Sequence, residues 1–228
     1  MLVSTKSERG WRDARRQREP DAGNPAAGCR SRATQQVAIR SLFLPTNTFN
    51  YTRTKPHLDQ AHLYWKNLLK PDDRVIDATC GNGKDSLRLA ELVPEGHVYA
   101  LDIQECALQK ARAFIPYSNI SYLHQSHTNL PAGVFKLIVY NLGYLPGGNK
   151  ELTTMTRTTL ESLAKASQLI TIGGGLSITC YPGHPEGARE EAAVREWAEG
   201  LDSKNWLISC HFWREKSPSL FYLVKAKN

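Results

Sequence analysis

Two glycines and an aspartate in the segment Asp77–Ser86 form the first group of residues with a recognisable chemistry. An apolar run ends at Asp77 and an amphipathic run begins at Ser86, which predicts a strand, a glycine-rich turn and a helix. Gly81 and Gly83 allow turn conformations that other residues avoid, and a ligand can lie against main chain that carries no side chain. The segment therefore predicts a ligand-binding loop.

A second acid, Asp102, lies at the end of the next apolar run, His97–Ile103. A carboxylate about 20 residues after a glycine-rich loop binds ribose hydroxyls in nucleotide-binding α/β folds. A dinucleotide site would require a third glycine in the G-x-G-x-x-G pattern, where this chain has Ser86. The combination instead suits S-adenosylmethionine (SAM), whose amino acid end needs close backbone approach and whose ribose needs a carboxylate acceptor. The alternative is an ordinary strand-to-helix turn that Asp77 caps.

A loop with three glycines, Asn141–Lys150, follows another predicted strand. Its first residues, Asn141 and Tyr144, resemble the Asn-Pro-Pro-Tyr loop of amino-methyltransferases. In that loop the amide oxygen and a main-chain carbonyl accept hydrogen bonds from an amine, and the aromatic ring stacks on the base. Leu142-Gly143 replaces Pro-Pro here. Methyl transfer to nitrogen is an in-line displacement, so positioning provides most of the catalysis. The alternative is an ordinary Gly-Pro loop.

Histidines lie near three predicted strand ends. His184 follows the strand Gly175–Tyr181 and is the candidate proton acceptor or substrate contact, because an aliphatic ammonium must lose a proton before it attacks. The alternative is that His184 caps the following helix. Ser126 and His127 follow the third strand, where class I methyltransferases hold the adenine ring. No carboxylate supports a metal site formed by His124, His127 and His184, so no metal is expected.

The elements that would position these residues alternate between strand and helix, which predicts a parallel sheet with right-handed crossovers. Two final strand-like runs with no helix between them predict an antiparallel hairpin. We therefore expect an α/β, Rossmann-like class I methyltransferase fold, with a mostly parallel seven-stranded sheet and helices on both faces. Gly173–Gly175 are expected to form a helix-to-strand turn, and the first helix to pack beneath the first strand. The predicted strands are Arg74–Asp77, His97–Ile103, Asn119–His124, Phe135–Asn141, Gly175–Tyr181, Trp206–Trp213 and Leu220–Lys225, and the predicted helices are Lys55–Leu69, Ser86–Val93, Glu105–Phe114, Leu152–Gln168 and Glu186–Leu201.

Composition places the chain among ordinary globular proteins. Its 228 residues, 41% of them hydrophobic, suffice for one α/β domain with a full core. It has no apolar run of the roughly 18 residues that a membrane span requires and no secretion signal at its N-terminus, so a soluble, cytoplasmic protein without a membrane partner is expected. Five cysteines without a C-x-x-C pair indicate neither disulfides nor structural zinc. We expect the four cysteines in or beside apolar runs to be core thiols: Cys80, Cys106, Cys180 and Cys210.

The net charge of +7 is concentrated near the N-terminus, where residues 1–40 carry nine Lys+Arg against four Asp+Glu, or +5, which leaves +2 for the remainder. We expect residues 1–50 to be a basic, disordered leader and residues 51–228 to be the folded domain, because the leader has little apolar content. Attraction of the leader to phosphate is the alternative. The location would be organellar if the chain is eukaryotic and the leader is a transit peptide, although its four acids fit such a leader poorly.

Taken together, the motifs resemble one family, the bacterial and plastid "putative rRNA methylase" family. The motifs are Asp77–Asp85, Asp102–Gln104, Ser126-His127, Asn141–Gly148 and Tyr181–His184, and the resemblance covers roughly Thr52 to Lys227. Members act as tRNA methyltransferases that convert 5-aminomethyl-2-thiouridine at the wobble position to its methylaminomethyl form, with SAM as donor. The resemblance implies that the cofactor-binding residues are Asp77, Thr79, Gly81, Asn82, Gly83, Asp85, Asp102, Gln104, Ser126, His127 and Asn141.

The same resemblance implies a tRNA anticodon stem-loop as substrate, with Asn141, Tyr144 and His184 at the reacting group. Two departures from the family pattern affect substrate contacts: Asn149 replaces Asp, and Arg214–Pro218 replaces an Asn- and Pro-rich segment. Basic residues in the second departure could contact phosphate. Three alternatives remain open, namely an rRNA methyltransferase, a methyltransferase of a small-molecule amine and a non-catalytic RNA-binding module. The sequence does not determine the oligomeric state, for which a homodimer is one candidate.

Overall fold

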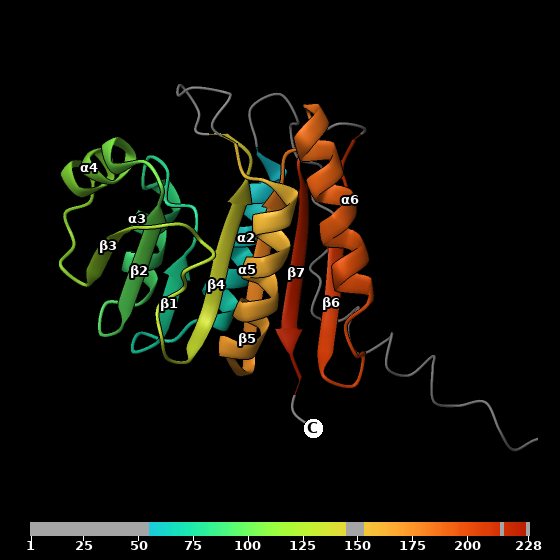
Figure 1. The fold of residues 1–228 in the computed structure, drawn as a ribbon. Helices are drawn as coiled ribbons and strands as arrows, with labels where there is room; N and C mark the ends of the chain where they lie inside the picture. The colour runs from blue at the N-terminus through green and yellow to red at the C-terminus, as the bar shows by residue number, and fades with distance from the viewer. Residues whose placement is uncertain (1–54, 145–152, 215–216, 227–228) are drawn as a thin grey trace, which may run out of the picture. The chain divides into compact units, whose positions relative to one another are not determined.

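A computed structural model describes residues 55–144, 153–214 and 217–226. Its centre is a seven-stranded sheet (Figure 1) made of β1 (Arg74–Asp77), β2 (His97–Asp102), β3 (Ile120–His124), β4 (Phe135–Leu142), β5 (Ile170–Cys180), β6 (Trp206–His211) and β7 (Ser219–Lys225). The order across the sheet is β3-β2-β1-β4-β5-β7-β6. The predicted leader, residues 1–50, lies outside the described residues.

Strands β1 to β5 run parallel to one another, and β7 runs antiparallel to both β5 and β6. Antiparallel neighbours need only a short connection, whereas parallel neighbours need a longer crossover. The prediction of a mostly parallel sheet with a C-terminal antiparallel hairpin is therefore confirmed. Because the parallel strands share one direction, their carboxyl ends meet at one edge of the sheet, where ligands bind in α/β folds.

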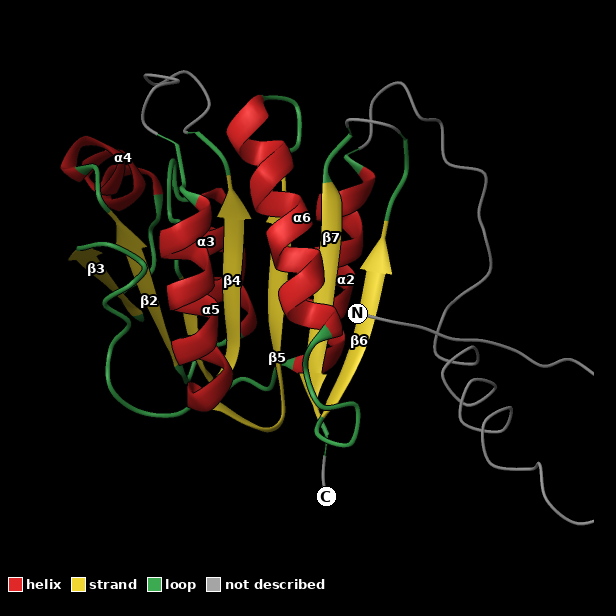
Figure 2. Cartoon of the chain, turned by 45° about the vertical axis from the view of Figure 1, so that its right-hand side comes forward, coloured by secondary structure: helices red, strands yellow, loops and turns green. Residues whose placement is uncertain are grey.

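Five helices cover the two faces of the sheet: α2 (Pro56–Leu68), α3 (Lys84–Leu92), α4 (Glu105–Phe114), α5 (Thr156–Leu169) and α6 (Pro185–Glu199). Figure 1 shows α5 and α6 in front of the sheet, and Figure 2 shows α2 behind it. Successive strand residues point to opposite faces, so Ile76 packs in one cluster with Leu163 of α5 and Val194 of α6. Its neighbour Val75 packs in another cluster, with Trp65 of α2.

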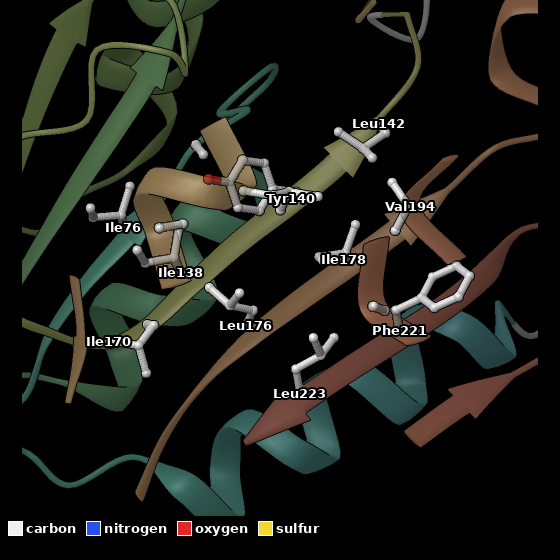
Figure 3. Close-up of a cluster of buried hydrophobic side chains, with 14 of the residues drawn as sticks. Ile76, Ile138, Tyr140, Leu142, Ile170, Leu176, Ile178, Val194, Phe221 and Leu223 are labelled. Atoms are coloured by element: carbon white, nitrogen blue, oxygen red, sulfur yellow. The ribbon is translucent and has the colours of Figure 1, made fainter. Parts of the chain in front are cut away.

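The core beneath α5 and α6 is shown in Figure 3. Side chains of β4 and β5 line it, among them Ile138, Tyr140 and Ile178, all of which are fully buried. Both strands are covered on both faces, which explains their almost continuous apolar sequences. The one polar atom of Tyr140 is satisfied, because its hydroxyl shares a 2.8 Å hydrogen bond with the hydroxyl of Ser162 on α5. A packed core of this kind holds the carboxyl ends of β4 and β5 in place.

Gly173–Gly175 differ from the prediction, because they lie inside β5 and do not form a helix-to-strand turn. The pairing of β5 with β4 shifts at this point: Phe135 lies opposite Ile170, whereas Leu137 lies opposite Gly175. The φ angle of Gly173 is 70°, a conformation that glycine adopts without strain. The glycines therefore accommodate an irregularity of the bulge type within a long strand.

One helix also differs from expectation. Helix α5 begins at Thr156 and not at Leu152, because Thr153 instead forms an isolated antiparallel bridge with Tyr144. Helix α2 shares a buried cluster with Val75 of β1, in line with the predicted packing, and it also contacts α3, β5 and β7. The other predicted elements are present within a few residues of their expected bounds.

The cysteines follow the prediction only in part. Cys80 and Cys180 are buried, as expected for core thiols, whereas Cys106 and Cys210 are exposed. Cys106 lies in the first turn of α4 and Cys210 near the end of β6, where one side of each element faces solvent. Across the part of the chain that the structure describes, no helix is long and apolar enough to cross a membrane.

Candidate active site

The glycine-rich loop occupies the point where the strand order reverses, between β1 and β4. Main-chain hydrogen bonds hold it there, because the N–H of Ala78 donates to the carbonyl of Val139 on β4 (2.9 Å) and the N–H of Cys80 donates to the carbonyl of Leu101 on β2 (2.8 Å). Ligands bind at such a switch point in open α/β sheets. The loop therefore has the position that its sequence predicts.

Asp77 supports this loop from below. Its Oδ1 accepts the N–H of Thr79 (3.2 Å) and its Oδ2 accepts the hydroxyl of Ser86 (2.6 Å). Burial, together with the nearby charge of Asp85, raises the pKa of Asp77 to about 7. The side chain of Asp77 is fully buried beneath the loop, and its predicted contact with the cofactor stays a prediction. Its role is to shape the loop, which is close to the capping alternative.

Asp102 connects the end of β2 to the glycine-rich loop. Its Oδ2 accepts the N–H of Gly81 (2.7 Å), and its Oδ1 accepts the N–H of Gln104 (2.8 Å). An ionised carboxylate has about four acceptor positions, so one remains on each oxygen. Two acceptors on one rigid, partly exposed carboxylate suit a pair of neighbouring hydroxyl groups. Gln104 contributes its main-chain N–H here.

Both glycines of the loop adopt left-handed backbone conformations, with φ angles of 53° for Gly81 and 79° for Gly83. A Cβ atom on Gly83 would lie 2.7 Å from the Cβ of Ala111 on α4 and 3.2 Å from the Cδ1 of Ile115. The space at Gly83 is therefore filled by α4. Gly83 thus permits packing of helix against loop, and the predicted close approach of a ligand to its main chain stays a prediction.

Asn141 is held by two polar contacts that tie β4 to the loop. Its N–H donates to the hydroxyl oxygen of Thr79 (2.7 Å), and its Nδ2 donates to Oδ2 of Asp85 (2.6 Å). The amide nitrogen is thus committed to a carboxylate, so Oδ1 is the acceptor left for a substrate. Thr79 and Asp85, both predicted as cofactor residues, act here on Asn141.

His62 of α2 completes this arrangement, and sequence reasoning missed it. Its Nε2 lies 2.9 Å from Oδ1 of Asp85, and its ring packs on Trp65 with centroids 4.8 Å apart. The contact joins positions 23 residues apart on two different helices. No local spacing in the sequence signals such a pair. The chain His62–Asp85–Asn141 runs from α2 to the end of β4.

Tyr144 and His184 lie side by side, with ring centroids 5.7 Å apart. His184 precedes α6, and its Nδ1 accepts the N–H of Gly187 (3.2 Å), which confirms the capping alternative for this nitrogen. A neutral ring that accepts at Nδ1 carries its proton on Nε2. Nδ1 of His184 is therefore occupied by the cap of α6, and its role as proton acceptor or substrate contact stays a prediction that concerns Nε2. Its Nε2 is buried and has no hydrogen-bond partner among the described residues.

Comparison with known proteins identifies the family and the fold. The chain matches the family described as "Putative rRNA methylase" over residues 98–225, more than half of its length. The chain belongs to this family. A chloroplastic tRNA (mnm5s2U34)-methyltransferase from Arabidopsis thaliana is 33% identical over 195 residues, which are 76% of this chain and 71% of the relative.

Solved structures agree with this assignment. A protein from Clostridium thermocellum described as a "putative rRNA-methylase" superposes with a TM-score of 0.70 at 31% identity, covering 74% of this chain and 97% of the other. A protein from Streptococcus mutans described as a "putative methyltransferase", in complex with S-adenosylhomocysteine (SAH), superposes with a TM-score of 0.68 at 28% identity, covering 75% and 99%. The present methylase is a SAM-dependent methyltransferase with the Rossmann-like class I fold.

The residues present fit the cofactor of the methylase family. The free acceptor positions of Asp102 suit the ribose diol, and the main chain of Gly81 lies next to the same carboxylate. Ile103, which sequence reasoning missed, is 56% exposed directly after Asp102. An exposed apolar side chain beside a ribose acceptor offers a surface for the flat face of adenine. A large apolar residue after the acid of β2 is the sequence signal that could have identified it.

Ser126 and His127 follow β3, and their side chains make contacts within the protein. The hydroxyl of Ser126 accepts hydrogen bonds from the N–H (3.2 Å) and the hydroxyl (3.0 Å) of Thr128, which closes a local turn. His127 is buried against Tyr140, with ring centroids 6.3 Å apart. Burial lowers the pKa of His127, so its ring is neutral at pH 7. Their predicted contacts with adenine remain predictions.

Metal chemistry has no candidate position in the described part of the methylase. Residues 55–144, 153–214 and 217–226 contain no group of three or more His, Cys, Asp or Glu side chains that could hold a metal ion. His184 lies against Tyr144, whereas His127 lies against Tyr140. Asn149, one of the two departures from the family pattern, lies outside the described residues.

Proposed function

We propose that this methylase transfers a methyl group from SAM to the amine of the 5-aminomethyl group on the wobble (thio)uridine of tRNA, giving 5-methylaminomethyl-2-thiouridine. The tRNA methyltransferase from Arabidopsis thaliana, 33% identical to this chain, supports the substrate class. The observation that carries the proposal is the orientation of Asn141, whose Nδ2 donates to Asp85 and whose Oδ1 is left to accept from an amine.

The cofactor supplies an electrophilic methyl group on a sulfonium. The residues of the chain provide position: Asp102 would hold the ribose, and Asn141 would accept an N–H bond and so aim the nitrogen lone pair. Holding two reactants in line is worth several orders of magnitude in rate, so no covalent nucleophile is required. The substrate ammonium would first lose one proton to solvent water; the N–C bond would then form as the S–C bond breaks, with S-adenosylhomocysteine as the leaving group.

Tyr144 is proposed to support the target base. Its ring is 38% exposed and lies beside His184 at the end of β4. Exposed aromatic rings stack on splayed-out bases of single-stranded RNA. Replacement of Tyr144 by Ala is expected to weaken RNA binding, whereas replacement by Phe keeps the ring and serves as the matched control.

The cellular location in this proposal is inferred from the same relative that supports the substrate class. The relative from Arabidopsis thaliana is chloroplastic, which supports an organellar location if the present chain is eukaryotic. The anticodon stem-loop is the proposed macromolecular partner. Residues 51–228 are proposed to form the catalytic domain.

The deciding experiment compares RNA substrates with labelled SAM. One substrate is tRNA from cells that lack this enzyme and carries 5-aminomethyl-2-thiouridine; the other is the same tRNA without the aminomethyl group. Digestion to nucleosides should show label in 5-methylaminomethyl-2-thiouridine from the first substrate and none from the second. Ribosomal RNA and free small amines are assayed in parallel.

The outcomes separate the alternatives. Equal labelling of both tRNAs, or labelling of ribosomal RNA alone, would refute the wobble-uridine assignment. Turnover of a free amine without any RNA would support the small-molecule methyltransferase instead. RNA binding without turnover of any substrate would support the non-catalytic module.

A further inference from the structure

An open depression of about 420 Å³ lies beside the active site, between α6 and the residues that follow β6. Its wall at one end is Pro182, which follows the last residues of β5 and lies two positions before His184. The other walls are Arg195 of α6 and the segment Phe212–Arg214. The depression and the proposed substrate site therefore share the segment that follows β5.

We propose that this depression binds nucleotides next to the target base in a single-stranded RNA loop. The inference rests on the proposed function, which supplies RNA as substrate, and it adds the surface that holds the RNA. Two arginines, Arg195 and Arg214, would contact phosphates, and the ring of Phe212 would stack on a base. These three residues we call the arginine–phenylalanine groove.

Phe212 is the aromatic surface of the groove. Its side chain is 51% exposed, and its ring packs edge-on against Phe221 of β7 with centroids 5.7 Å apart. The guanidinium carbon of Arg195 lies 4.6 Å from the centroid of the Phe212 ring. An exposed ring with a cation beside it matches a nucleotide, which carries both a flat base and a negative phosphate.

Arg214 lies at the other side of the groove, in a turn with defined hydrogen bonds. The N–H of Arg214 donates to the hydroxyl oxygen of Ser217 (2.9 Å), and that hydroxyl donates to the carbonyl of Arg214 (2.7 Å). The turn fixes the main chain from which the exposed Arg214 side chain extends. This is also the segment in which the sequence departs from the family pattern by adding basic residues.

Trp213 also lines the groove, and ring contacts hold its side chain in place. Its ring stacks on His211 with centroids 6.0 Å apart and lies 6.2 Å from the ring of His57. The hydroxyl of Tyr64 hydrogen-bonds Nε2 of His211 at 2.8 Å. Burial lowers the pKa of His57 to about 4 and also lowers the pKa of His211, so both rings are neutral at pH 7. The positive charge of the groove therefore comes from its arginines.

The chemistry of the groove favours single-stranded RNA over other occupants. Two arginines outweigh the single acid in the lining, Glu191, so a negatively charged partner is favoured. A duplex would present its bases stacked inside, where Phe212 could not reach them. Single-stranded loops present unstacked bases to aromatic side chains and phosphates to arginines. An anticodon loop has both features beside its target base.

The test measures binding of a synthetic anticodon stem-loop RNA to the SAH-saturated protein. We expect Arg195→Gln and Arg214→Gln together to weaken binding about tenfold or more and to lower the slope of log K against log salt by about 0.7 for each lost phosphate contact. Phe212→Ala should weaken binding about fivefold or more, as loss of base stacking does, without changing the salt slope.

Matched controls come from α4, which packs beside β2 and β3 at the opposite end of the sheet. Phe114 is 52% exposed, and the guanidinium carbon of Arg112 lies 5.1 Å from the ring of Tyr122. Phe114→Ala and Arg112→Gln should leave RNA affinity unchanged. Equal SAH affinity in all variants would show that each is folded.

Unchanged RNA affinity and salt slope in the arginine variants would overturn the groove while leaving the proposed function intact, provided that the wild-type protein methylates tRNA. A wild-type protein that methylates no tRNA would instead refute the proposed function. Equal losses in the α4 variants would show that the effect is general charge attraction and would also overturn the groove.

Discussion

Asn141 Nδ2 donates a hydrogen bond to Oδ2 of Asp85 over 2.6 Å. A terminal amide can be turned either way, and the hydrogen-bond network decides which end faces a substrate. Here the carboxylate takes the nitrogen end, so the oxygen end faces away from Asp85. The orientation of one acceptor thus depends on a residue in the first turn of α3, and through His62 on α2.

Replacement of Asn141 by Ala should lower kcat and leave SAM affinity within a few-fold of wild type. The lost acceptor acts mainly in the transition state, and removal of one oriented hydrogen-bonding group at a reacting centre costs about 100-fold or more in rate. Single-turnover kinetics with calorimetry of SAM binding would check it. If SAM affinity fell as far as kcat, Asn141 would belong to the cofactor site instead.

His62 should act as a positioning residue through Asp85. His62→Leu removes the contact with Asp85 and is expected to lower kcat about tenfold, which is less than Asn141→Ala does. His62→Gln keeps a donor near the same place and should restore most of the rate. Equal defects in both variants, accompanied by a lower melting temperature, would indicate a purely structural role for His62.

Much of this arrangement could be predicted from the sequence, because periodicity and turn residues are local signals. The loop at Gly81, the acid at Asp102 and the polar end of β4 at Asn141 all follow apolar runs, and parallel strands place their carboxyl ends at one edge. Tertiary contacts could not be predicted in this way. His62 meets Asp85 across two helices, and Gly83 is required by Ala111, which lies on another helix.

The two ends of β5 show the same limit. A run of three glycines has the local signature of a turn, yet Gly173–Gly175 continue a strand because β4 offers a hydrogen-bonded neighbour on one side. His184 has the residue type of a base, but its Nδ1 accepts from the first turn of α6. In each case the hydrogen-bonding neighbour, and not the residue type alone, determines the structural role of the segment.

Asp102→Ala should abolish SAM binding or weaken it at least tenfold. The ribose hydroxyls would lose their acceptors, and the N–H groups of Gly81 and Gln104 would lose theirs. Isothermal titration with SAM and SAH would measure it, with Asp72→Asn, an exposed position, as control. Unchanged affinity in the Asp102 variant would contradict the assignment of the ribose site.

Gly83→Ala should destabilise the fold before it affects chemistry. A Cβ atom would lie 2.7 Å from the Cβ of Ala111, and the φ angle of 79° disfavours any other residue. We expect a loss of about 2 kcal/mol or more in the free energy of unfolding, from overpacking and backbone strain together. Urea denaturation would measure it. A variant with normal stability and weakened SAM binding would instead support close approach of the ligand at Gly83.

Asp77 should make the stability of the protein depend on pH. Its pKa is raised from 3.8 to about 7 in the folded protein, because burial disfavours the charged form. A carboxyl group that holds its proton more tightly when folded contributes stability that is complete below the unfolded pKa and is lost as pH rises through the folded pKa. As pH rises from about 4 to about 7, ionisation of this group alone lowers the free energy of unfolding by up to about 1.4 kcal/mol per pH unit.

The Asp77→Asn variant isolates this contribution, because it cannot ionise. Its Oδ1 can still accept from one partner, but one of the contacts to Thr79 and Ser86 is lost, which costs about 1 kcal/mol at every pH. The stability of the variant relative to wild type should therefore rise from pH 5 to pH 8. Urea denaturation followed by tryptophan fluorescence at both values would measure it, and a relative stability that stays constant across this range would show that Asp77 is ionised in the folded protein.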